Sequence, residues 1–459
     1  MVTWRAAVLL CLGAASMPLW PWPWTGLAVV LAAVALLCAL DLRAAAALKQ
    51  VTLTREGQRA VRLGDEAVVT LKIHNSGVRT LRADLRDDWV PSAGAGQTTH
   101  RLEIAPGATG VVETRLRPTR RGDRPAVRVT LRSHGPLRLT FRQLGARPAT
   151  PGWTLRVLPR FESRRFLAEK VSRLRVLDGS TAVRGRGRGT EFDALREYVG
   201  GDDVRSIDWR ASARRSDVLV RTWRPERDRR VLCVLDTGRT SAVRVDRTSA
   251  PAPRPAWLPA LPPPTGPVPA HGEPRLDAAI DAALLLAALA GRAGDRVDLL
   301  AVDTAVRASV AGAGREALLP RLVDAVAPLQ PALVETDFEL VVGEIMRRER
   351  KRALVVLFTT LEPGPIGEGL LPVLPRLASR HKVLVASVHD PALTALTSRM
   401  PEDAEQAYAA VAAHQAFAER DRVRDALVRH GVEVVDAPLA EFASRVSDAY
   451  LTLKAAGRL

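Results

Sequence analysis

Two apolar runs near the amino terminus constrain this chain more than any other feature. The runs extend from Ala6 to Trp20 and from Thr25 to Leu40, contain no charged residue, and are separated only by Pro21-Trp22-Pro23-Trp24. Each is shorter than the ~20 residues of an upright membrane-spanning helix. Together with the Trp-rich link they predict a transmembrane helical hairpin over residues 1–43, with its tip at the far membrane interface.

Basic residues flank both open ends of the predicted hairpin. Arg5 precedes the first run, and Arg43, Lys49 and Arg55 follow the second. Because Lys and Arg mark cytoplasmic ends of spans, we expect two spans in the cell inner membrane and the bulk of the chain in the cytoplasm. The rival interpretation is a signal peptide ending near residues 13–16, which leaves one anchor and places the body outside. The uncharged tip and the symmetry of the two runs favour the hairpin.

Length and charge narrow the function classes. At 459 residues the chain has room for two or three domains. Its formal net charge of +17 is compatible with binding to nucleic acid or anionic membranes, but Arg is spread over every region and only six of the 67 basic residues are Lys. No aromatic-basic platform supports nucleic-acid binding, and three cysteines in apolar segments predict neither a disulfide framework nor a zinc site.

Residues 44–160 alternate in short apolar and polar steps, with turn signals such as His74-Asn75-Ser76-Gly77 between them. This pattern is typical of antiparallel strands joined by hairpins. We therefore expect an all-β, immunoglobulin-like sandwich that serves as a spacer or protein contact. The predicted strands are Val51 to Thr54, Ala67 to Ile73, Leu81 to Leu85, Arg101 to Ile104, Val111 to Leu116, Ala126 to Leu131, Leu137 to Phe141 and Trp153 to Val157.

Residues 161–228 contain the densest polar segment of the chain, from Gly185 to Arg215. Phe192, Leu195 and Val199 recur at helical spacing, and Gly200-Gly201 followed by Asp202-Asp203 offers a stop and a cap. We therefore predict helix, tight turn, helix and then a strand. Its alternating acids and arginines favour a structural clamp of paired charges; an active site and a partner surface remain alternatives.

Residues 229–459 alternate helical and strand patterns. Val231 to Leu235 and Val297 to Val302 are buried-strand candidates, and the Pro- and Ala-rich stretch 241–274 reads as a flexible insertion without its own core. Tyr408, Val411 and Phe417 form the apolar face of a long helix that we expect to pack. The alternation predicts an α/β domain with a parallel, Rossmann-type sheet covered by helices on both faces.

The polar segment resembles the signature of the bacterial family called domain of unknown function 58, and the resemblance extends to Tyr450-Leu451-Thr452-Leu453-Lys454. The carboxyl half is similar to a von Willebrand factor A domain. The resemblance implies a partner-binding role for a set of signature residues. They are Glu191, Asp193, Arg196, Glu197, Tyr198, Asp202, Asp203, Arg205, Asp208 and Trp209.

Domains that resemble von Willebrand factor A often hold a divalent cation on an Asp-x-Ser-x-Ser loop, and the resemblance implies a degenerate version here. Asp236 and Thr240 fall on the first loop, Thr336 on the second, and Gly238 replaces the first serine. The usual later acid has no counterpart nearer than Glu362. Mg²⁺ or Mn²⁺ is therefore one interpretation, and an Asp236 that caps a loop or pairs with an arginine is the other.

These patterns predict a membrane-anchored cytoplasmic scaffold without enzymatic activity of its own. The family resemblance implies a MoxR-type AAA+ ATPase as partner, in chaperone-like maturation of other proteins. The chain contains no phosphate-binding Gly-rich loop with Lys-Ser/Thr. Two alternatives are a metal-assisted hydrolase that uses Asp202, Asp203 and Asp208, and a nucleic-acid-binding protein.

Overall fold

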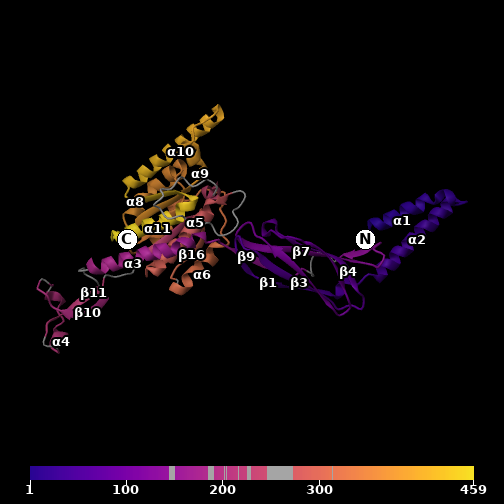
Figure 1. Cartoon of the computed structure of the whole chain (residues 1–459), viewed down its shortest axis with the longest axis horizontal. Coiled ribbons are helices and arrows are strands. Elements are labelled where there is room, and N and C mark those ends of the chain that lie inside the picture. The colour runs from indigo at the N-terminus through magenta and orange to yellow at the C-terminus, as the bar shows by residue number, and fades with distance from the viewer. Residues whose placement is uncertain are drawn as a thin grey trace. The chain divides into compact units, whose positions relative to one another are not determined.

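The computed structural model describes residues 1–143, 150–184, 191–200, 202, 204–214, 217–224, 229–245, 272–312 and 314–459, without the side chains of 19, 178–184, 191–194, 222–224 and 315. The chain divides into two compact units, Met1–Leu158 and Pro159–Leu459, and Figure 1 labels several helices and strands of each. The predicted flexible insertion at 241–274 falls outside the described residues over 246–271.

The first unit begins with two helices, α1 (Trp4–Ala15) and α2 (Pro23–Ala44), joined through η1 (Met17–Leu19). Gly13 of α1 lies directly against Val30 of α2. At about 1.5 Å per residue, α2 spans roughly 33 Å and α1 only about 18 Å. Within the described residues, one helix is therefore long and apolar enough to cross a membrane, with a mean hydropathy of 2.3.

Two sheets form the rest of this unit. The strand order is β1-β3-β6 in one and β2-β9-β7-β4-β5 in the other, with β8 paired to β7. Apolar residues of both sheets, including Leu71, Leu85 and Leu131, share one buried core. The strands are β1 (Val51–Gly57), β2 (Ala60–Arg62), β3 (Ala67–Asn75), β4 (Leu81–Trp89), β5 (Thr99–Ile104), β6 (Thr109–Leu116), β7 (Gly122–His134), β8 (Phe141–Gln143) and β9 (Thr154–Leu158).

The mostly β unit agrees with the expected alternation, because β3 and β4 bury every second residue. One predicted strand, Leu137 to Phe141, is wrong. Most of that segment is a loop up to β8: the amides of Leu137, Leu139 and Thr140 donate to the carboxylate of Asp41 in α2, and only an isolated antiparallel bridge joins Thr140 to Val2.

The second unit contains a six-stranded sheet in the order β16-β15-β12-β17-β18-β19. All neighbours are parallel except β16, an antiparallel edge strand that the sequence did not predict. The strands are β12 (Arg230–Asp236), β15 (Arg296–Val302), β16 (Val306–Val310), β17 (Leu354–Phe358), β18 (Lys382–His389) and β19 (Glu433–Pro438).

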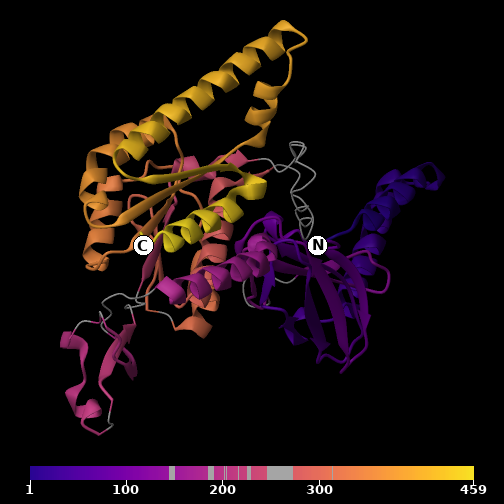
Figure 2. The same ribbon diagram turned by 60° about the vertical axis from the view of Figure 1, so that its left-hand side comes forward.

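Helices cover both faces of this sheet (Figure 2). Leu232 and Val234 of β12 point into a core with α7, α8 and α10, while α5 and α11 pack on the opposite face. The helices are α3 (Leu167–Arg184), α5 (Arg275–Arg292), α6 (Arg315–Val326), α7 (Phe338–Arg348), η7 (Pro365–Leu370), α8 (Leu371–Ala378), α9 (Pro391–Ser398), α10 (Ala404–Arg429) and α11 (Leu439–Ala455).

The polar signature segment forms a hairpin of strands, and the predicted first helix is wrong. β10 (Glu191–Glu197) pairs antiparallel with β11 (Leu219–Arg224), and η5 (Val204–Ser206) and α4 (Trp209–Ser212) lie between them. Leu195 and Val199 are exposed, so their helical spacing does not mark a buried face. The pairing with β11 therefore decides the local conformation.

Candidate functional site

The candidate site lies at the carboxyl end of β12, the central strand from which the sheet is built outward in both directions. Sheets of this kind bind ligands beside such a point, where the chain order reverses. Asp236 ends β12 and is only 3% exposed. The loop that follows wraps around it: the amide of Gly238 donates to Oδ1 over 2.8 Å, and Ser241 Oγ donates to its carbonyl over 2.5 Å.

Three threonine hydroxyls converge on the Asp236 carboxylate. Thr336 donates to Oδ1, while Thr359 and Thr240 donate to Oδ2 over 2.6 and 3.5 Å. Burial raises the pKa of Asp236 above its usual value, against the opposing effect of these hydrogen bonds. We call Asp236, Thr240, Thr336 and Thr359 the Asp236 cluster. Sequence reasoning placed the first three together but missed Thr359, whose signal is a hydroxyl directly after the adjacent buried strand β17.

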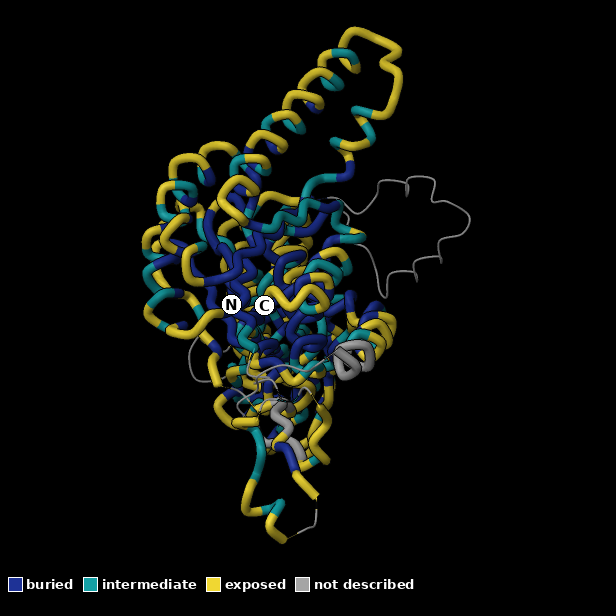
Figure 3. The backbone as a smooth tube through the Cα atoms, turned by 90° about the vertical axis from the view of Figure 1, so that its left-hand side faces the viewer, coloured by how far each residue is buried: buried dark blue, intermediate teal, exposed yellow. Residues whose placement is uncertain are grey.

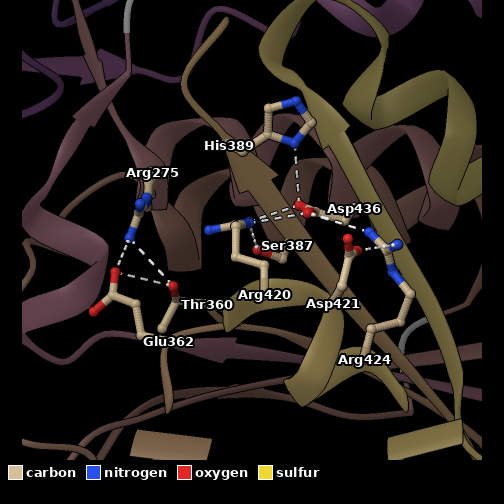
Figure 4. A network of polar contacts seen from close by, with 9 residues as sticks. All are labelled: Arg275, Thr360, Glu362, Ser387, His389, Arg420, Asp421, Arg424 and Asp436. Atoms are coloured by element: carbon tan, nitrogen blue, oxygen red, sulfur yellow. Dashed lines mark hydrogen bonds and ion pairs between the residues drawn. The ribbon is translucent and has the colours of Figure 1, made fainter. Parts of the chain in front are cut away.

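The Asp236 cluster fits a resident divalent cation poorly. Its donors are all oxygen, as Mg²⁺ and Mn²⁺ require, but it holds a single carboxylate whose two oxygens already accept four hydrogen bonds. Glu362, the nearest substitute acid in the sequence, accepts instead from Arg275 over 2.6 Å (Figure 4). Within the described residues, no three His, Cys, Asp or Glu side chains gather in a metal-binding group.

A second polar network occupies the same edge of the sheet, at the ends of β18 and β19 (Figure 4). Arg420 Nη2 donates to Asp436 Oδ1 over 2.7 Å, and His389 Nδ1 lies 3.2 Å from the same oxygen. Burial alone would raise the pKa of Asp436, but the hydrogen bonds from His389 and Arg420, with their charges, hold it at about 2. Ser387 Oγ accepts from Arg420. This network is an ion pair that ties α10 to the sheet.

Other acids at this edge have structural partners as well. Asp390 caps α9 by accepting from the amide of Ala392 over 2.9 Å. Asp303 is fully buried, accepts from Thr237 over 3.0 Å and pairs with Arg307 over 2.7 Å. Asp390 thus caps a helix, and Asp303 holds the loops after β12 and β15 in place.

The signature acids also have separate structural contacts. Asp202 accepts from Arg196 over 2.6 Å and from the amide of Val199 over 3.0 Å. Asp208 caps α4, accepting from the amides of Arg210 and Ala211, and it pairs with Arg221 over 2.8 Å. The predicted cap of this short helix, at Asp202 or Asp203, is thus five or six residues too early.

The remaining signature residues lie on the surface of this hairpin or outside the described set. Glu197, Tyr198, Arg205 and Trp209 are exposed. Asp203 and the side chains of Glu191 and Asp193 lie outside the described residues.

Large apolar side chains are exposed on the α9–α10 hairpin, which follows the carboxyl end of β18. Met400, Tyr408 and Val411 are 90%, 79% and 65% exposed. The long helix at the top of Figure 3, α10, is exposed or half-buried along most of its length. The prediction that Tyr408 and Val411 pack is therefore wrong; only Phe417 does so, with its ring 5.7 Å from that of His389.

Known proteins resemble parts of this chain. Proteins described as uncharacterized from Mycobacterium tuberculosis H37Rv and Mycobacterium bovis are each 28% identical over 207 residues, 45% of this chain and 56% of the relative. The match thus spans about half the length of these curated relatives.

Two solved structures align with about a quarter of the chain at low TM-scores. The CARDB domain of the PF1109 protein from Pyrococcus furiosus is 14% identical, with a TM-score of 0.19 over 26% of this chain and 91% of its own. A FixG-related protein from Vibrio parahaemolyticus is 11% identical, with a TM-score of 0.17 over 24% of this chain and 96% of its own.

The carboxyl-terminal region gives the family match. A family model matches residues 194–250 and 270–433, which include most of the β10–β11 hairpin, the Asp236 cluster and the α9–α10 hairpin. This region of the chain therefore matches the family described as Protein of unknown function DUF58.

Proposed function

We propose that this protein is a membrane-anchored cytoplasmic scaffold that binds a protein partner through the edge of its α/β sheet. The observation that carries the proposal is the exposure of three large apolar side chains, Met400, Tyr408 and Val411, on the hairpin that leaves the sheet at its carboxyl edge. Large exposed apolar side chains grouped on one element are characteristic of interaction surfaces. Tyr408 and Val411 lie on α10, and Met400 lies in the segment that precedes it.

The anchor in this proposal is a two-span hairpin of α1 and α2. α2 is long enough to cross the hydrocarbon core, and Trp20, Trp22 and Trp24 are exposed at the turn between the helices, as expected at a membrane interface. α1 alone is shorter than a span, so the bilayer would have to thin locally around it, or the flanking residues would have to continue the crossing. Arg5 and Arg43 would keep both open ends in the cytoplasm.

The partner in this proposal is a MoxR-type AAA+ ATPase, and the complex matures other proteins in a chaperone-like manner. The proposal gives this chain no chemistry of its own, because Asp202 and Asp208 are each used in a cap or an ion pair. Such contacts support a clamp more than a metal-assisted hydrolase. Nucleotide hydrolysis would come from the partner.

Capture of the ATPase by the full-length chain in mild detergent tests the proposal. We expect the purified MoxR-type ATPase of the same organism to be retained by the wild-type chain and lost with the double variant Tyr408→Ser/Val411→Ser. Val428→Ser is the matched control, because Val428 is also exposed, at 54%, on the same helix. No retention by the wild-type chain would contradict the partnership. Equal retention by all three would contradict the docking surface.

Labelling in spheroplasts tests the orientation. Cys233 is buried and its pKa is raised to about 12, so it will not react. In a Cys11→Ala/Cys38→Ala background, we expect Met400→Cys to react with a membrane-impermeant maleimide only after lysis. Labelling of intact spheroplasts would place the carboxyl unit outside and overturn the cytoplasmic assignment.

A further inference from the structure

A cavity of about 490 Å³ lies where the amino-terminal helices meet the β-sandwich. Its walls are Trp4, Val8 and Leu9 of α1, Leu37 of α2, and Leu137 and Leu139 of the loop before β8. One charged residue, Arg5, completes the lining. The volume falls within the roughly 300–1,000 Å³ of small-molecule sites, and an apolar wall with one cation defines the ligand chemistry.

We propose that this cavity binds an anionic phospholipid, with Arg5 on its phosphate and the apolar wall against its acyl chain. The proposal rests on the membrane anchor proposed above and adds a ligand to it. Val8, Leu9 and Leu37 belong to the two apolar helices, so the apolar wall of the cavity is continuous with the surface that would face lipid. A bilayer lipid could therefore enter along the helices.

The loop that forms the far wall is fixed by α2. Asp41, only 1% exposed, accepts from the amides of Leu137 over 2.8 Å and of Leu139 and Thr140 over 2.9 Å. Arg142 Nη2 also donates to the carbonyl of Leu42 over 2.9 Å. The amide of Thr3, just before α1, donates to the carbonyl of Leu139 over 2.9 Å. Both helices are thus joined to the loop, and the cavity exists without its ligand.

Charge at this level of the chain favours an anionic ligand. Arg5 of α1 is exposed and forms no ion pair with any described residue. Arg138, in the loop before β8, forms no ion pair with a described residue either. The nearby Asp41 carboxylate accepts hydrogen bonds from the loop amides and from the Thr140 hydroxyl and forms no ion pair with either arginine. A guanidinium binds a phosphate through charge-assisted hydrogen bonds. Trp4, 73% exposed beside Arg5, is the side chain expected at the headgroup level.

Lipid retention by the full-length chain in detergent, followed by native mass spectrometry, tests the proposal. We expect phosphatidylglycerol to bind at least about tenfold more tightly than phosphatidylethanolamine, because only the former carries a net charge for Arg5. Arg5→Gln should abolish that preference. Val8→Trp, which places a larger side chain in the cavity, should weaken the binding of both lipids. Arg43→Gln, which removes an exposed arginine at the end of α2 outside the cavity lining, should bind like the wild type.

Several outcomes would overturn the lipid site. The proposal is wrong if Arg5→Gln and Val8→Trp bind phosphatidylglycerol as the wild type does. It is also wrong if Arg43→Gln loses as much affinity for the lipid as Arg5→Gln. Competition by glycerol 3-phosphate at the same concentration as the lipid would likewise contradict it. Carbonate extraction of membranes separates this failure from that of the anchor. A chain that resists extraction but shows no lipid preference contradicts the site alone, and an extracted chain contradicts the anchor as well.

Discussion

Oγ1 of Thr336 occupies the space that a side chain on Gly238 would need, because a Cβ built there would lie 2.2 Å from it. The carbonyl of Val334 would lie 2.9 Å from the same Cβ. The backbone of Gly238 itself is extended, with φ −74° and ψ −173°, so the obstacle is packing and not strain. The glycine that replaces the first serine of the Asp-x-Ser-x-Ser pattern is therefore required by the position of Thr336.

Gly238→Ser should destabilise the protein and should not create a cation site. Forcing a side chain into a filled space costs typically about 1–3 kcal/mol. We expect a lower thermal midpoint in detergent and no heat of Mg²⁺ binding by calorimetry. The double variant Gly238→Ser/Thr336→Ala should recover part of the loss, since Val334 still lies close. An unchanged midpoint in Gly238→Ser would show that the loop moves freely, against the packing described.

Stability should fall in acid through the Asp436 ion pair. The pKa of this group lies at about 2, below its usual 3.8, so its contribution is complete above about pH 4 and is lost as the pH falls toward 2. A shift of this size corresponds to roughly 2 kcal/mol. Urea unfolding at a series of pH values should show this loss in the wild type and a shallower one in Asp436→Asn.

Removal of a single partner of the same ion pair should destabilise the protein at neutral pH. Asp436→Asn leaves Arg420 buried at 6% exposure with its charge unpaired, a situation that typically costs about 3–5 kcal/mol. The double variant Asp436→Asn/Arg420→Met should regain much of that stability. If the double variant is less stable than Asp436→Asn, the network does more than balance charge.

Asp208 should behave as a helix cap and not as a catalytic acid. The hydrogen bond that it accepts from the amide of Ala211 lowers its pKa most, followed by the hydrogen bond from Arg221, and the amide of Arg210 contributes least. We expect Asp208→Ala to accelerate amide hydrogen exchange at residues 210 and 211, and Asp208→Asn to do so less because its side-chain oxygen can still cap. Unchanged exchange in Asp208→Ala, together with the loss of a measurable turnover, would instead support the hydrolase.

The sheet of the second unit could be predicted because its central strands are buried on both faces. Leu354–Phe358 is buried at every position, and such strands read as continuous apolar runs. Edge strand β16 escaped prediction because most of its residues are exposed, so its sequence carries no such run. The helical spacing of Phe192, Leu195 and Val199 led to a wrong helix prediction for a related reason. Apolar periodicity indicates a buried helix face only where another element covers that face.

The site was partly predictable and partly not. Asp236 could be predicted from the position of an acid after a buried strand, and Thr336 from the family resemblance. The exposure of Tyr408 could not be predicted, because it depends on what α10 packs against, and no local sequence pattern contains that information. Asp41 was missed altogether. A single acid at the end of an apolar helix gives no periodic signal, and its partners are amides 96 to 99 residues away.

Because Asp41 attaches α2 to the loop before β8, the candidate span and the sandwich cannot rotate independently of each other. A tilt of α2 in the bilayer would therefore tilt the sandwich by the same angle, and bilayer thickness, which sets the tilt of a long apolar helix, would govern which side of the sandwich faces the lipid headgroups. Lengthening the hydrocarbon chains of the host membrane should then reorient this unit without any change in its internal contacts.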